Sequence, residues 1–140
     1  MPPEKPVDRW LRKAAEDLRV AEILLKSGDP AIPYGAICFH AQQAAEKYLK
    51  GWLVSRGRPA PRTHSLLYLV SRAEGVDGRF RGLREIAERL TPFAVASRYP
   101  GDIPDPEEPE ALKAIERAKA IRDFVERLSP PPPEQRLPIP

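Results

Sequence analysis

One stretch of the sequence carries more polar side chains than a helix beside a hydrophobic core normally needs. Residues 39 to 50 read Phe-His-Ala-Gln-Gln-Ala-Ala-Glu-Lys-Tyr-Leu-Lys. At about 100° per residue, His40, Gln43 and Lys47 form a stripe along one edge of that helix. An imidazole, an amide and an ammonium in line can balance phosphate charge and direct hydrogen bonds. This edge is therefore a candidate site for a ligand or a partner.

The same residues also have an ordinary structural interpretation. Gln43 with Lys47, and Glu46 with Lys50, are spaced four residues apart. Such pairs stabilise a helix by about 0.2–0.5 kcal/mol each. Under this interpretation the stripe is a helix flank that binds nothing, and the residues alone leave both interpretations open.

Two further polar segments lie downstream of the stripe. His64 follows Arg62 and Thr63 after a proline-rich linker, and it either caps the next helix or belongs to a site. Arg98 and Tyr99 stand in the run Ser-Arg-Tyr-Pro-Gly. Arg98 either pairs with acidic groups of the last helix or contacts a phosphate, and Tyr99 is either a lid over the core or an exposed acceptor.

Most enzyme classes with a local sequence signature are disfavoured. The chain has no Walker loop, GxGxxG, HExxH or GxSxG motif. His40 and His64 are its only histidines, and Cys38 is its only cysteine. The sequence therefore predicts no metal site and no required cofactor, although a bound nucleotide remains possible.

Helical periodicity covers nearly the whole chain, and no segment alternates as a β-strand does. The predicted helices run from an Asp8 N-cap to Gly28, from about Tyr34 to Arg56, from Thr63 or His64 with Leu66, Leu67, Leu69 and Val70 buried, from about Phe80 to Leu90, from Pro92 through Ala96, and from an Asp105 N-cap to Ser129. The predicted fold is all-α, an up-and-down bundle of four main helices with short accessory helices.

The chain has room for one domain. It has 140 residues, of which 41% are hydrophobic. We expect a flexible N-terminus over residues 1–7, a helical domain over 8–129 and an extended proline-rich tail over 130–140.

Charge, cysteine content and amino-acid usage indicate which partners, cellular compartment and growth conditions the sequence fits. The net charge is +3, and residues 54–90 carry eight basic and four acidic groups, which permits contact with nucleic acid without indicating it. A single cysteine and the lack of a signal sequence or membrane span predict a cytoplasmic protein. The absence of Asn and the excess of Arg fit a thermophile, or equally a GC-rich genome.

Four segments together resemble the HEPN family of prokaryotes, small helical proteins often encoded beside a minimal nucleotidyltransferase. They are Trp-Leu-x-x-Ala-x-x-Asp-Leu from Trp10 to Leu18, Phe-x-x-Gln-Gln-Ala-x-Glu-Lys-x-Leu-Lys from Phe39 to Lys50, Thr-His-x-Leu from Thr63 to Leu66, and Arg-Tyr-Pro from Arg98 to Pro100. The resemblance implies a homodimer, nucleotide binding, partnership with the nucleotidyltransferase in a toxin-antitoxin pair and, in many branches, RNA cleavage.

The cleaving branches of that family carry Arg-x(4 to 6)-His near the start of a late helix. No histidine follows Arg98 here, and a literal Arg-x5-His from Arg58 to His64 lies in the proline-rich linker instead. We therefore expect a binding component without ribonuclease activity, which uses His40, Gln43, Lys47, Arg98 and Tyr99. Two alternatives stay open: a metal-independent ribonuclease toxin that uses His64 and Arg98, and a purely structural dimerisation module.

Overall fold

The computed structural model describes residues 2–96 and 104–128, and all regular structure in those ranges is helical. The elements in chain order are α1 (Pro6–Leu25), α2 (Tyr34–Ser55), α3 (Leu66–Glu74), the 3-10 helix η1 (Gly78–Leu83), α4 (Arg84–Leu90), α5 (Phe93–Ala96) and α6 (Glu108–Leu128). The predicted all-α helical bundle is confirmed.

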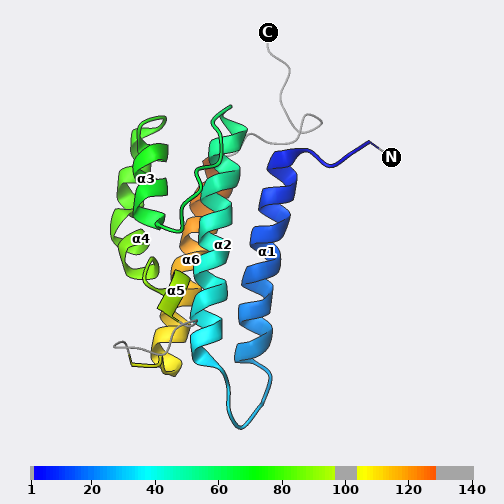
Figure 1. Cartoon of the computed structure of the whole chain (residues 1–140), viewed down its shortest axis with the longest axis vertical. Helices are drawn as coiled ribbons and strands as arrows, with labels where there is room; N and C mark the ends of the chain where they lie inside the picture. The colour runs from blue at the N-terminus through cyan, green and yellow to red at the C-terminus, as the bar shows by residue number, and fades with distance from the viewer. Residues whose placement is uncertain (1, 97–103, 129–140) are drawn as a thin grey trace.

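Helix α2 is the centre of the bundle. It packs against α1, α6, α3 and α5, and Figure 1 shows it between α1 on one side and the α3 and α4 layer on the other. Because neighbours surround it, α2 buries side chains around most of its circumference, including Ile37, Leu49 and Trp52. This confirms its predicted central position and explains why its polar residues are not simply solvated.

Glycines end the two long N-terminal helices where the sequence predicts. Gly28 and Gly57 follow α1 and α2 with φ of 71° and 74°, which is left-handed backbone that glycine adopts without a steric penalty. Both stops are confirmed, and they set the lengths of the helices that carry the candidate residues.

Both predicted N-caps of the outer long helices are wrong. Helix α1 already begins at Pro6, whose fixed φ suits a first helical position, so Asp8 lies in the first turn rather than at the cap. Helix α6 begins at Glu108, and the N–H of Glu107 donates to Glu110 Oε2 at 3.0 Å. That bond joins the residue before the helix to the third residue within it, which makes Glu107 rather than Asp105 the N-cap residue.

The short third helix also starts later than predicted. Ser65 is the N-cap of α3, and its hydroxyl oxygen accepts the N–H of Tyr68 at 3.2 Å. The buried residues of α3 are Leu66, Leu69, Val70 and Ala73. Leu67, predicted to be buried, is 38% exposed because it points away from that face.

Three aromatic rings join α2, η1 and α6. Phe80 is fully buried, with its ring centroid 4.3 Å from that of Trp52 and 4.9 Å from that of Phe124. The predicted helix from Phe80 to Leu90 is therefore two elements, since η1 turns Phe80 into the core before α4 begins.

Gly51 is the point of closest approach between α1 and α2. A Cβ there would lie 3.0 Å from Trp10 Cβ and 3.0 Å from Leu11 Cδ2. Gly51→Ala gains helix propensity of about 1 kcal/mol but must push α1 outward, at a typical cost of about 1–3 kcal/mol. We expect a net loss of stability in urea unfolding.

A matched control exists in η1. A Cβ on Gly82 would meet nothing within 4 Å, so Gly82→Ala should be neutral or slightly stabilising. If Gly51→Ala stabilises the protein as much as Gly82→Ala does, the close approach of α1 is not a packing constraint.

None of the helices in the described ranges is long and apolar enough to cross a membrane.

Candidate functional site

An aspartate of α1 holds two of the predicted site residues on α2. Asp17 Oδ1 lies 3.0 Å from His40 Nδ1, and its other carboxylate oxygen accepts from Lys47 Nζ. The Asp17 side chain is only 14% exposed, whereas His40 and Lys47 stay partly exposed. The Asp17 carboxylate therefore holds the His40 and Lys47 side chains from their buried side and leaves part of each exposed to solvent.

A second carboxylate, Glu46, is almost completely buried on the neighbouring edge of α2. Its Oε2 accepts from Lys50 Nζ at 3.0 Å, and its Oε1 lies 2.9 Å from His64 Nδ1. The side chains of Glu46 and Lys50 are 5% and 9% exposed. Burial of an ion pair is tolerated only when each charge is well paired, and here both are.

Two glutamines of α2 extend the network around Glu46 and His64. Gln42 is fully buried and donates to the backbone oxygen of His64 at 2.9 Å. Gln43 Nε2 donates to Gln42 Oε1 at 2.7 Å. These residues form two neighbouring hydrogen-bonded networks on α2, and together we call them the polar cluster: Asp17, His40, Gln42, Gln43, Glu46, Lys47, Lys50 and His64.

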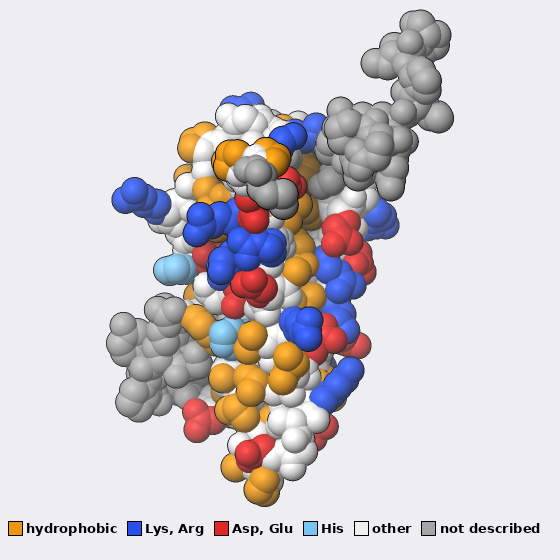
Figure 2. Space-filling model, turned by 90° about the vertical axis from the view of Figure 1, so that its right-hand side faces the viewer, with side chains coloured by type: hydrophobic (Ala, Val, Ile, Leu, Met, Phe, Trp, Pro, Cys, Tyr) orange, Lys and Arg blue, Asp and Glu red, His pale blue; other side chains and the backbone are white. Residues whose placement is uncertain are grey.

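The structure brings four predicted residues to one surface. His40, Gln43 and Lys47 lie on α2 as the helical spacing requires, and His64 joins them through its bonds to Gln42 and Glu46. Figure 2, seen from the α1 side, shows two separate histidine patches, one of them at the left edge of the view, with acidic and basic side chains nearby. Arg98 and Tyr99 lie outside the described residues.

The helix-pair interpretation is correct for one pair and wrong for the other. Glu46 and Lys50 do pair, but in a buried setting rather than on a solvated flank. Gln43 and Lys47 instead bond to Gln42 and Asp17.

His64 has the arrangement of a group that can transfer a proton. Nδ1 of His64 lies 2.9 Å from Glu46 Oε1, and in the tautomer that donates from Nδ1 the carboxylate oxygen accepts that hydrogen bond. Nε2 then carries the free lone pair of the neutral ring, and the imidazole is 59% exposed. Such a carboxylate fixes the tautomer and orientation of the histidine.

The comparisons with known proteins agree with the all-α fold. The family model for the HEPN domain matches residues 7–128, which extend from the start of α1 to the end of α6. The chain belongs to the HEPN family. The resemblance inferred from four sequence segments is thereby confirmed.

Two solved structures resemble this HEPN domain closely. TT1696 from Thermus thermophilus is 34% identical, with a TM-score of 0.76 over 89% of this chain and 98% of that one. ST0689, an archaeal HEPN homologue, is 28% identical, with a TM-score of 0.69 over the same shares. No curated protein matches the chain.

Sequence reasoning missed four members of the polar cluster in this HEPN domain: Asp17, Gln42, Glu46 and Lys50. Asp17 is 23 residues from His40 and 30 from Lys47, so nothing local links them. A signal was available for Glu46, because Ala44, Ala45 and Leu49 around it are all apolar and buried. A charged residue within such a surrounding indicates an internal partner.

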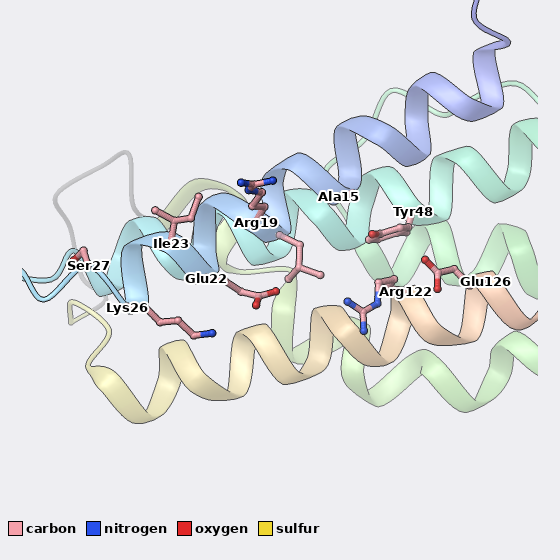
Figure 3. Close-up of a pocket in the computed structure, with 10 residues that line it drawn as sticks. Ala15, Arg19, Glu22, Ile23, Lys26, Ser27, Tyr48, Arg122 and Glu126 are labelled. Carbon is pink, nitrogen blue, oxygen red and sulfur yellow. The ribbon is translucent and has the colours of Figure 1, made fainter.

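An open groove of the HEPN domain lies elsewhere, between α1 and α6 (Figure 3). It encloses about 720 Å³ and is lined by Arg19, Lys26, Arg122, Glu22 and Glu126 over an apolar floor that includes Tyr48. Burial raises the pKa of Tyr48, with a smaller contribution from Glu126. The groove is lined by three basic and two acidic side chains. Their charges nearly cancel, so the groove shows no preference for an anion.

Nucleophilic and metal chemistry have little support in the described part of the chain. Burial raises the pKa of the Cys38 thiol to about 11, so it stays protonated at neutral pH. Among the described residues, no three His, Cys, Asp or Glu side chains are grouped so as to hold a metal ion.

Proposed function

We propose that this HEPN domain binds a nucleotide-bearing ligand at the polar cluster, as one component of a toxin-antitoxin-like pair with a minimal nucleotidyltransferase. The observation that carries the proposal is the convergence of His40, Gln43, Lys47 and His64 on one face, each held by an internal partner. Side chains that are already oriented lose less entropy when a ligand binds.

The donors of the cluster suit a phosphate ester with directional contacts. Lys47 offers an ammonium, while Gln43 and His40 offer hydrogen bonds that fix orientation. The charge of Lys47 is shared with Asp17, and that of Lys50 with Glu46, so the cluster alone is close to neutral. Additional positive charge must therefore come from outside it, and Arg98 is the residue that the sequence suggests for this role.

The partner rather than this chain supplies the chemistry in this proposal. The chain has no histidine after Arg98 and so lacks the late Arg-x(4 to 6)-His of the cleaving HEPN branches. We propose a homodimer that presents two polar clusters to its nucleotidyltransferase. The structural alternative is a dimerisation module that binds no ligand, in which the polar cluster only stabilises the fold.

One observation favours a second candidate function, a metal-independent ribonuclease. The His64 imidazole is exposed and backed by buried Glu46, which suits it to accept a proton from a ribose 2′-hydroxyl. The oxygen could then attack the adjacent phosphate, and water would protonate the leaving 5′-oxygen. Growth arrest with RNA cleavage on induced expression, lost in His64→Ala, would favour this candidate.

Titration calorimetry tests the leading proposal. ATP, GTP and a short single-stranded RNA are titrated into the wild type and into the double variant His40→Ala/Gln43→Ala. Removal of two hydrogen-bonding groups should weaken binding by roughly tenfold. The matched control is Lys113→Ala on the exposed face of α6, which should bind as the wild type does. If none of the three probes gives a saturable binding signal, the proposal fails and the structural dimerisation module is the remaining interpretation.

A further inference from the structure

A pocket on the α1 side adjoins the polar cluster and shares Lys47 with it. The pocket encloses about 550 Å³, within the range of small-molecule sites, and is lined by Glu4, Pro6, Arg9, Trp10, Lys13 and Lys47. The function proposed above leaves all of these residues except Lys47 without a role.

An indole forms part of its wall. Trp10 is partly exposed, whereas Trp52, the other tryptophan of the chain, is only 1% exposed. Gly51 lets α1 approach α2 closely at this point, since an added Cβ would lie 3.0 Å from Trp10 Cβ, and Lys50 Nζ lies 5.8 Å from the centroid of the indole. The ring is thus held by the fold while it remains accessible from the pocket.

The pocket adds two basic side chains, Arg9 and Lys13, to Lys47, whose charge is shared with Asp17. Three of its lining residues are basic and one, Glu4, is acidic, and Glu4 is already paired with Arg12 at 3.0 Å. Arg9 forms no ion pair with the described residues. Lys13 pairs with Glu16 at 3.4 Å, but both side chains are about half exposed, and exposed pairs are weak enough to exchange for a phosphate.

We propose that this pocket takes a nucleotide unit, with its base stacked on Trp10 and its phosphate between Arg9, Lys13 and Lys47. An aromatic platform beside basic side chains is how proteins bind single-stranded nucleic acid without reading its sequence. Every base has a π-face, so the pocket is expected to tolerate different bases. The inference rests on the function proposed above. It adds a second part to the proposed binding site, in which the base of the nucleotide stacks on Trp10.

Tryptophan fluorescence tests the stacking directly, because Trp52 is buried and Trp10 faces the pocket. The probes are ATP, oligo(A) RNA and inorganic pyrophosphate, titrated into the wild type, Trp10→Leu, Trp10→Phe and the control Lys113→Ala. ATP and RNA should quench the wild type, and pyrophosphate should not. Trp10→Leu should lose the quenching and bind about 5- to 100-fold more weakly by calorimetry, and Trp10→Phe should recover part of the affinity.

Comparison of the titrations with oligo(A) RNA and with ATP shows whether the bound nucleotide unit belongs to an RNA strand or is a free nucleotide. Tighter binding of oligo(A) with a steep salt dependence, reduced in Arg9→Ala, assigns the pocket to an RNA strand. Equal affinity for ATP assigns it to a free nucleotide, and both results support the proposal. Pyrophosphate binding as tightly as ATP, or unchanged affinity in a folded Trp10→Leu, overturns it.

The outcome also separates this inference from the proposed function. If His40→Ala/Gln43→Ala loses binding and Trp10→Leu keeps it, the polar cluster is the site and the stacking inference fails. If the reverse holds, the pocket binds the nucleotide without the cluster. Far-UV circular dichroism and urea unfolding of each variant show that lost binding is not lost folding.

Discussion

Lys50→Ala is expected to lower the free energy of unfolding by about 3–5 kcal/mol, as measured by urea denaturation. The ammonium of Lys50 is the ion-pair partner of Glu46, and both side chains are more than nine-tenths buried. Removing the lysine leaves the carboxylate in a poorly solvated place with only His64 as a partner. Such a loss is a large part of the roughly 5–15 kcal/mol that stabilises a typical domain.

Two further variants test the cause of that loss. Glu46→Leu/Lys50→Met replaces both charges with apolar groups, and such replacements are often neutral, so it should recover most of the stability. Lys113→Ala, on an exposed position of α6, should change it by less than about 0.5 kcal/mol. Equal destabilisation by the single and double variants would show that packing rather than unpaired charge is responsible.

Phe80→Ala is expected to cost a similar amount, about 3–5 kcal/mol in the same assay. Phe80 is fully buried and its ring contacts those of Trp52 and Phe124, so truncation removes apolar contact and opens a cavity between η1, α2 and α6. The Trp52 indole N–H is buried and has no hydrogen-bond partner among the described residues, so this part of the core depends on packing rather than on polar bonds.

A tyrosine on the outside of α3 provides the comparison for Phe80. Tyr68 is 48% exposed, and Tyr68→Ala should cost less than about 1 kcal/mol. A loss for Phe80→Ala no larger than that for Tyr68→Ala would mean that η1 can detach from the bundle without affecting the rest of the core.

The polar cluster shows which parts of a site can be predicted from helical spacing and which cannot. Helical spacing correctly placed His40, Gln43 and Lys47 on one edge of α2, because residues three and four apart share a face. It did not reveal that Asp17 pairs with two of them, since α1 and α2 meet through a turn and antiparallel packing. Side-chain partners across helices depend on the packing of whole elements.

His64 shows the same limit for chemistry. In the sequence it stands in a polar corner after a proline-rich linker, with a helix cap as its simpler role. In the structure Ser65 is the cap, and Glu46 of α2 accepts the Nδ1 proton of His64. A charge buried on a neighbouring helix turned an ordinary surface histidine into an oriented one.

The amino-acid sequence alone determined that this protein is an all-α HEPN domain with α2 at its centre, because helix periodicity, glycine stops and family motifs are local properties of the chain. The tertiary structure decided which side chains from different elements meet: Asp17 with His40 and Lys47, Glu46 with His64, and Trp10 in the pocket that Lys47 also lines. The Asp17 contacts arise from the close packing of α1 on α2, for which Gly51 leaves room, whereas the Glu46–His64 contact joins α2 to the segment before α3. Pairs between different elements depend on how those elements pack, and local spacing does not encode them; Glu46 and Lys50, four residues apart on α2, are the pair that spacing does predict.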